Sequence, residues 1–202
     1  MNGNMKFAAA VVVGMLCAGF NASHAQTAQR VRGTITATKG DDITVKATNG
    51  RTVDVLVTDK TNIVFGQPMA ITDIKPGDFL GVTSVRRKDG TLTAYDIRRF
   101  IKPSNPGHRP FDGRSDQTMT NANVSATVQG TSGRELTLNY EGGSQKVSVA
   151  DTAAIVSLTP GQRSQLTTGS YVSLLADTGS SGKLEARNIE VRNGKEAPKP
   201  PL

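Results

Sequence analysis

Residues 31–101 of this chain recur as residues 124–192, and this internal repeat constrains the fold more than any other feature of the sequence. Matching positions separated by 92 residues include Ile63 and Ile155, Gly77 and Gly169, Phe79 and Tyr171, Ala94 and Ala186, and Ile97 and Ile189. The shared positions are mainly apolar residues and glycines, which build a fold, and almost no reactive side chain recurs. One structural unit is therefore used twice.

Each copy alternates apolar and polar residues with a period of two, as in Ile43–Ala47 and Leu136–Tyr140, which is typical of strands with one buried face. Asn49-Gly50 and Gly142-Gly143 mark hairpin turns between such runs. The expected strands are 31–38, 42–48, 51–58, 78–86 and 91–101, then 123–130, 135–140, 145–150, 170–177 and 183–192. A connection of about twenty residues, with one helical turn at Met69–Ile74, separates the third strand from the fourth.

Five short strands in about seventy residues favour a closed barrel, because closure removes exposed sheet edges. We therefore expect an all-β fold of two tandem small five-stranded, OB-like barrels. Their boundaries are 26–102 for the first and 122–192 for the second. A Pro/Gly-rich linker, 103–121, joins them, and a disordered or polyproline tail, 193–202, ends the chain.

The last strand of each copy shifts its alternation by one residue. Leu92 and Ala94 keep a period of two, but the next apolar residue is Ile97, and the second copy repeats this shift before Ile189. An extra residue in the strand restores both isoleucines to the core. The sequence therefore predicts a β-bulge in each copy.

Residues 1–25 have the pattern of a signal peptide: Lys6, an apolar run from Phe7 to Phe20, and small residues before a cleavage site after Ala25. The fourteen-residue run is shorter than the roughly 20 residues that span a bilayer. Leu16 disfavours a lipid attached to Cys17, which is the chain's single cysteine. We expect a periplasmic product, with secretion as the alternative, that has no membrane span after cleavage and no disulfide.

The positive charge is concentrated in the first copy: residues 26–102 carry 13 basic and 8 acidic side chains, whereas residues 122–192 carry six of each. The candidate anion-binding residues are Arg86, Arg87 and Lys88 at a hairpin tip, and Arg98 and Arg99 at the end of the returning strand. Strand alternation sends Arg98 and Arg99 to opposite faces. A charge excess that serves only solubility remains the alternative.

The linker places His108, Arg109, Phe111 and Asp112 within five residues, with Met119 close behind. A soft metal could use His108 and Met119, or a small ligand could be held here by these side chains with Arg109 and Asp112. The alternative is structural: Phe111 fills a gap between the barrels while Arg109 and Asp112 pair on the surface. No cofactor is indicated.

The chemistry of enzymes is poorly represented, and we expect a protein that is not an enzyme. After cleavage the chain has one histidine and no cysteine, which excludes thiol catalysis and a histidine-rich metal site. Asp41-Asp42 fits a hairpin turn better than a carboxylate pair. Nucleic acid is disfavoured, because aromatic residues, on which single strands stack, make up only 4% of the chain.

The first copy also resembles a known family through Gly33-Thr34-Ile35, Ile74-Lys75-Pro76-Gly77-Asp78 and Gly90–Ile97. This is an uncharacterised family, a domain of unknown function, of exported bacterial β-barrel domains that often occur in tandem. The resemblance implies export and a barrel fold, and it brings no activity and no site residues.

The sequence thus favours a non-enzymatic, exported structural or binding module of the bacterial cell envelope. Its expected partner is an anionic envelope polymer or an envelope protein, contacted through the basic first barrel. The alternative is a periplasmic metal- or small-ligand-binding accessory protein that uses the linker. The sequence leaves the oligomeric state and the orientation of the barrels open.

Overall fold

The computed structural model describes residues 28–130, 133–179, 182–194 and 198–201, and its regular structure is all β. The predicted signal peptide lies outside these residues. The strands are β1 (Gln29–Lys39), β2 (Asp42–Ala47), β3 (Thr52–Leu56), β4 (Asn62–Pro68), β5 (Phe79–Arg86), β6 (Leu92–Arg99), β7 (Gly107–Phe111), β8 (Arg114–Gly130), β9 (Gly133–Tyr140), β10 (Gly143–Pro160), β11 (Tyr171–Thr178) and β12 (Leu184–Arg192). Two single 3₁₀ turns, η1 (Ile71–Asp73) and η2 (Arg163–Gln165), interrupt them.

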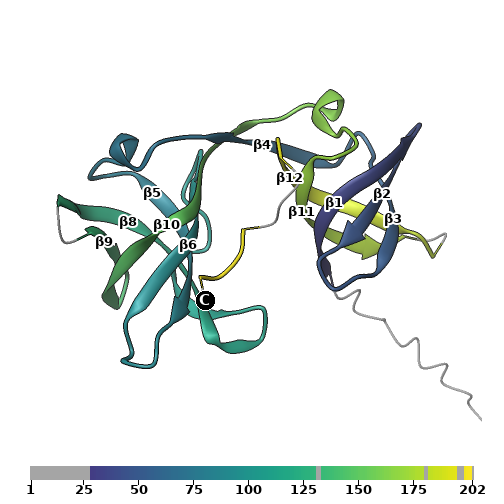
Figure 1. The fold of residues 1–202 in the computed structure, drawn as a ribbon. Helices are drawn as coiled ribbons and strands as arrows, with labels where there is room; N and C mark the ends of the chain where they lie inside the picture. The colour runs from purple at the N-terminus through teal and green to yellow at the C-terminus, as the bar shows by residue number, and fades with distance from the viewer. Residues whose placement is uncertain (1–27, 131–132, 180–181, 195–197, 202) are drawn as a thin grey trace, which may run out of the picture.

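One group of strands forms a closed five-stranded barrel in the order β11-β1-β2-β3-β12, and β12 returns to pair with β11. We call it the first ring. In Figure 1 it is the right-hand group, and it mixes the purple start of the chain with its yellow-green end. Its core contains Ile35, Val45 and Val55 from early strands and Leu174 and Ile189 from late ones. The first ring therefore depends on both copies of the repeat.

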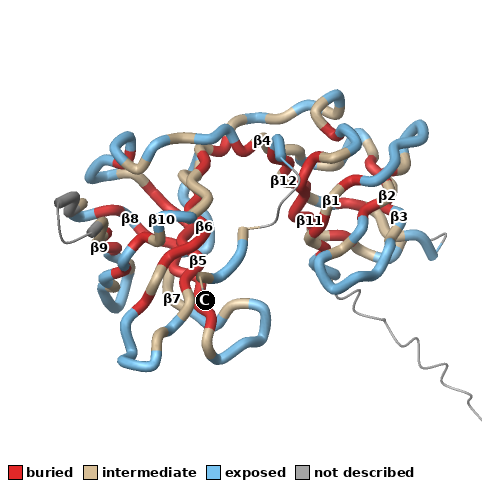
Figure 2. The backbone as a smooth tube through the Cα atoms, viewed as in Figure 1, coloured by how far each residue is buried: buried red, intermediate tan, exposed pale blue. Residues whose placement is uncertain are grey.

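The remaining strands make a second cycle of pairings, which we call the second ring: β6 with β5, β5 with β8, β8 with β9, β9 with β10, and the start of β10 with β6. It is the left-hand group of Figure 1. Its core joins Leu80, Val82 and Ile97 of the first copy to Leu136 and Leu138 of the second. Figure 2 shows the buried residues of both groups as red stretches on the strands, with exposed turns between them.

The two copies have thus exchanged their last two strands, and the expectation of one barrel per copy is wrong. Residues 26–102 supply β1–β3 to the first ring and β5–β6 to the second. The second copy supplies β8–β10 to the second ring and β11–β12 to the first. The cause is the connection after β3. It is not a loop but the extended strand β4, which carries the chain away from the first ring (Figure 1).

The exchanged copies meet in an antiparallel pair formed by β4 and the end of β10. At its centre Gly66 pairs with Leu158, its own counterpart 92 residues later. On either side the pairs are also equivalent: Asn62 with Asn188 on one flank, and Ala154 with Asp96 on the other. A pseudo-twofold axis therefore passes through the Gly66–Leu158 pair and relates the two copies.

The predicted bulges are confirmed. Thr83 pairs with Asp96 and Ser84 with Ala94, which leaves Tyr95 as the extra residue of β6. The extra residue of β12 is Arg187, at the equivalent position. Both following isoleucines, Ile97 and Ile189, are fully buried in the two cores.

The predicted linker is also regular structure, which corrects the boundary at 103–121. Asp112 and Gly113 have φ of 60° and 68°, the backbone that a two-residue hairpin turn needs, so β7 and the start of β8 pair across them. Pro110 lies in β7, which is at the edge of the sheet, where proline is tolerated in a strand. The hairpin extends the second ring toward the first.

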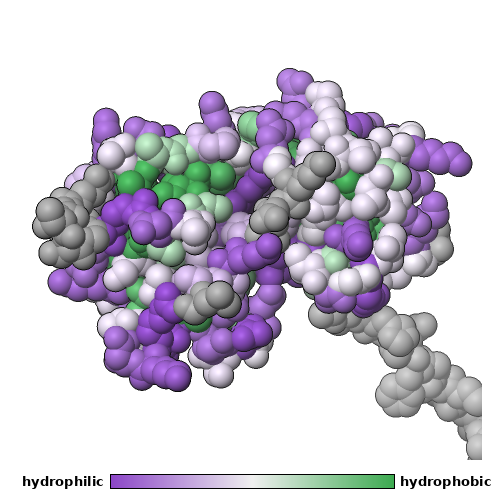
Figure 3. Space-filling model, viewed as in Figure 1, coloured by the Kyte–Doolittle hydropathy of each residue, from purple (hydrophilic) through white to green (hydrophobic). Residues whose placement is uncertain are grey.

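The surface is mixed in character. Figure 3 shows hydrophobic residues gathered over the second ring and mainly hydrophilic or neutral residues elsewhere on this face. Within the described part of the chain, no helix is both long enough and apolar enough to span a bilayer.

Candidate functional site

The tip of the β7–β8 hairpin touches the first ring through one arginine of β1. Arg32 forms an ion pair with Asp112, and its Nη2 donates to Asp112 Oδ1 at 3.1 Å. The same guanidinium lies 4.5 Å from the centre of the Phe111 ring, a cation–π distance. Phe111 therefore does occupy the space between the rings, whereas Asp112 pairs with Arg32 and not with Arg109.

Beside this contact lies a cleft of about 570 Å³ between the two rings. The first ring contributes Arg30, Ser173 and Glu190 to its walls, and the second contributes Arg98 and Phe100. The segment that joins the copies contributes Ile101, Lys102, Arg109, Asp112, Met119 and Asn121. Ile101, 51% exposed, is the one large hydrophobic side chain counted as exposed among the described residues. The cleft thus combines cations with an apolar rim.

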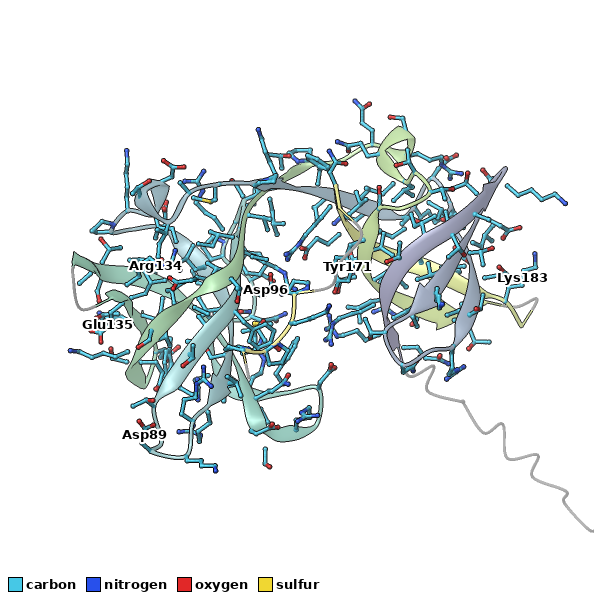
Figure 4. All side chains as sticks on the ribbon, viewed as in Figure 1. Asp89, Asp96, Arg134, Glu135, Tyr171 and Lys183 are labelled. Atoms are coloured by element: carbon cyan, nitrogen blue, oxygen red, sulfur yellow. The ribbon has the colours of Figure 1, made fainter. Side chains whose placement is uncertain are left out.

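A buried network of four charged side chains lies where the rings meet, and two of its members, Arg98 and Glu190, line the cleft. Arg98 binds Asp96 (Nη2 to Oδ2, 2.5 Å) and Glu190 (Nε to Oε2, 2.9 Å). Arg192 binds the same two carboxylates (Nη1 to Asp96 Oδ1, 2.7 Å; Nη2 to Glu190 Oε1, 2.6 Å). Each arginine therefore bridges both acids, and the set is neutral. Figure 4 shows Asp96 on the side of the second ring that faces the first.

In this network Arg98 stays charged, and its guanidinium is bound to two carboxylates. Burial lowers the pKa of Arg98, and the neighbouring Asp96 and Glu190 carboxylates outweigh that effect and raise it overall. Arg98 is only 8% exposed, so its two bound carboxylates leave little of it for an external anion. Arg98, a predicted anion-binding residue, does line the cleft, but its charge is paired with Asp96 and Glu190 where the rings meet.

Three cations of the cleft, Arg30, Lys102 and Arg109, form no salt bridge with a described residue. Burial, followed by repulsion from Arg32 and Arg98, lowers the pKa of Arg30, and the weaker attraction of Asp112 and Glu190 only partly offsets this. Lys102 is exposed and likewise makes no ion pair within the described chain. Arg109 donates to the Asn105 carbonyl at 3.0 Å. Because the two lining acids are already paired, the free charge of the cleft is positive.

The other predicted anion-binding residues lie elsewhere. Arg86, Arg87 and Lys88 are at the β5–β6 turn beside Asp89, at the far end of the second ring (Figure 4). Arg86 Nη1 donates to the Gly90 carbonyl at 3.1 Å, and Arg87 Nε donates to Thr93 Oγ1 at 3.1 Å. These local bonds hold two of the three cations against their own hairpin.

Arg99 points away from Arg98, as strand alternation predicts. Its Nε and Nη2 donate to Ser157 Oγ at 3.3 and 3.1 Å, and its Nη1 lies 3.7 Å from Asp78 Oδ2. Arg99 therefore fastens β6 to β10 and has no part in the cleft.

The predicted metal pair is not assembled. His108 pairs with Thr120 and Arg109 with Met119, and cross-strand partners share a face, so His108 and Met119 project to opposite faces. His108 Nδ1 lies 2.8 Å from Thr120 Oγ1, and its ring stacks on Tyr140 with centres 6.3 Å apart. Burial and the charge of Arg86 lower the pKa of His108. Across the described residues, no group of three His, Cys, Asp or Glu side chains could hold a metal ion.

Two site features went unnoticed in the sequence. Asp112-Gly113 is a strong hairpin signal that proline-rich surroundings obscured. Arg30 precedes the first expected strand, and nothing in the local pattern marks it as facing a second ring.

A comparison with protein-family models matches residues 32–98 to DUF5666, a domain of unknown function. No curated protein and no solved structure matches the chain. The matched segment runs from β1 of the first ring to β6 of the second. A single family unit in this chain is therefore divided between two rings.

Proposed function

We propose that the chain, whose residues 32–98 match an uncharacterised domain family, is a non-enzymatic, exported binding module of the bacterial envelope. Its ligand is an anionic group, phosphate or carboxylate, of an envelope polymer. The cleft between the rings takes this group. The hairpin tip at Arg86–Lys88, which the sequence favoured, is secondary because two of its three cations, Arg86 and Arg87, are hydrogen-bonded within the hairpin.

One observation carries the proposal: Arg30 and Lys102 line the same cleft, and neither forms a salt bridge with a described residue. Repulsion from Arg32 and Arg98 contributes to the lowered pKa of Arg30, so an anion there would relieve an existing electrostatic cost. A volume of about 570 Å³ lies within the range of small-ligand sites and admits one or a few charged units of a polymer.

The periplasmic location rests on the signal-peptide pattern of residues 1–25 and is part of the proposal. The alternative, a small-ligand-binding accessory protein, would use the same cleft, because Arg109, Asp112 and Met119 of the predicted linker line it. The metal form of that alternative loses its support, since His108 and Met119 face opposite ways.

The test compares two double variants that remove equal charge. The probes are polyphosphate and polyglutamate of defined length, which separate phosphate from carboxylate ligands. Arg30→Ser/Lys102→Ser should abolish binding at low salt, while Arg86→Ser/Lys88→Ser should leave most of it. Binding by the native chain should weaken steeply as salt rises above about 0.1 M.

Equal losses from both double variants would mean that only net charge matters, and the excess charge would then serve solubility. Full binding by Arg30→Ser/Lys102→Ser would exclude the cleft. Thermal melting of each variant verifies that the fold is retained.

A further inference from the structure

A second cavity, of about 590 Å³, lies between the rings on the other side of Arg32 and is bounded by the C-terminal tail. Tyr95 and Gln117 come from the second ring, and Tyr171 comes from the first. Pro198, Lys199 and Pro200 form part of its wall. The tail leaves the first ring after β12, so its position joins one ring to the other.

The cavity is aromatic in a chain that has few aromatic residues. The chain contains three tyrosines and no tryptophan, and two of the three tyrosines, Tyr95 and Tyr171, line this one cavity. They are only 5% and 3% exposed, and Figure 4 shows Tyr171 on the side of the first ring that faces the second. The third, Tyr140, stacks on His108 at a different place.

The same side chains offer hydrogen-bond donors that the protein leaves unused. Tyr95 donates its hydroxyl hydrogen to Gln117 Oε1 at 2.9 Å. This bond fixes the Gln117 amide and leaves its N–H groups without an acceptor among the described residues. The Tyr171 hydroxyl likewise donates to no described residue, and the Arg192 guanidinium lies 6.0 Å from the centre of its ring.

A proline-rich segment has the complementary chemistry. Proline has a carbonyl acceptor and no N–H, and polyproline II leaves those carbonyls free while presenting apolar rings to aromatic surfaces. Pro198 and Pro200 line this cavity, and Pro201 follows them, so the segment has three prolines in four residues. We propose that the groove formed by Tyr95, Gln117 and Tyr171 is a binding site for a proline-rich segment, and that the chain's own Pro198–Pro201 occupies it. This site is independent of the anion-binding cleft.

The test deletes the C-terminal tail from the chain and adds the same segment back as a synthetic peptide. The truncated chain, lacking residues 198–202, should bind a synthetic peptide of residues 193–202. Tyrosine fluorescence reports the binding directly, because no tryptophan masks it. The intact chain should bind the peptide about tenfold more weakly, since its tethered tail competes at a local concentration on the order of millimolar.

Equal binding by the intact and truncated chains, or no binding by the truncated one, would overturn the proposal. A peptide with its three prolines replaced by glycine should not bind. Tyr171→Ala in the truncated chain should weaken binding about tenfold, because it removes one of the two aromatic rings that line the groove. Tyr140→Ala, outside the groove, should leave the affinity unchanged, and an equal loss in both tyrosine variants would also contradict the assignment.

Discussion

Arg98 and Glu190 occupy equivalent positions of the two copies, 92 residues apart, and they bind each other at 2.9 Å where the rings meet. If both copies carried the same charge at this position, the pseudo-twofold axis would place two like charges together. Because the two copies carry opposite charges at this position, the two side chains attract each other and form part of the buried network. The two copies have therefore diverged at the residue through which they touch.

The first prediction concerns this pair. Glu190→Gln leaves two buried arginines with one carboxylate and should lower the free energy of unfolding by about 3–5 kcal/mol. Arg98→Met should also destabilise. The double variant leaves Asp96 and Arg192 as a balanced pair, so its loss should be about 1–3 kcal/mol smaller than the sum of the single losses. Urea denaturation measures all three.

The exposed pair Arg114–Asp116 serves as the control for that cycle. Its side chains are 59% and 46% accessible, so removing either should change stability little. Strict additivity of the Arg98 and Glu190 variants would show that the two residues do not act as a unit.

The second prediction concerns the exchange of strands. A protease site inserted after Pro103, in the exposed segment between β6 and β7, divides the chain into its two copies. The cut halves should elute together from a sizing column in native buffer and separate only in denaturant, because each ring uses strands from both. Two folded fragments eluting separately would indicate one barrel per copy.

The third prediction concerns Gly33 of β1. A Cβ at this position would lie 2.1 Å from the Lys46 carbonyl oxygen, a backbone atom of the neighbouring strand. Gly33→Ala should therefore destabilise the protein by about 1–3 kcal/mol in chemical denaturation. Gly179→Ala is the matched control, because its nearest contact is 3.4 Å. Comparable effects at both glycines would argue against the close approach of β1 and β2.

The fourth prediction concerns pH. Burial, followed by the charge of Asp96, raises the pKa of Tyr95 to about 12. A group that binds its proton more tightly when folded stabilises the fold below its unfolded pKa of about 10 and loses this effect as pH rises toward 12. The free energy of unfolding should therefore fall by up to about 3 kcal/mol across that window.

Tyr95→Phe should remove this part of the fall, as measured by denaturation at successive pH values. Ultraviolet titration should show the last tyrosine ionising near pH 12 in the native chain and that step missing in Tyr95→Phe. A native chain in which all tyrosines ionise near pH 10 would contradict the burial of Tyr95.

The sequence predicted ten of the strands because alternation and turn residues are local signals. It could not predict the exchange, because the two copies have the same apolar pattern. The pair β5–β6 and the pair β11–β12 could each pack equally well into either of the two cores. A signal was present in Ile63-Val64-Phe65, an apolar run typical of a strand, within the segment assigned to a loop. Seven extended residues move the chain about 23 Å, too far to return to the same ring.

The candidate site was less accessible to prediction. Alternation predicted that Arg98 and Arg99 lie on opposite faces of β6, but a sequence does not show that Glu190, nearly a hundred residues later, packs against Arg98. The separation of His108 from Met119 follows from the register of β7 and β8, which depends on the turn at Asp112-Gly113. Once that hairpin is recognised, alternation alone rejects the metal pair.

The exchange of strands also sets the order in which the molecule can be finished during synthesis. Every strand of the second ring has been made once β10 is complete, whereas β1, β2 and β3 wait for β11 and β12, the last strands of the chain. Val31 and its partner Leu174 are 143 residues apart, a separation that makes closure of the first ring slow. β1–β3 are therefore synthesised first but are among the last strands to complete their pairing. Until then their edges can pair with a strand of another chain.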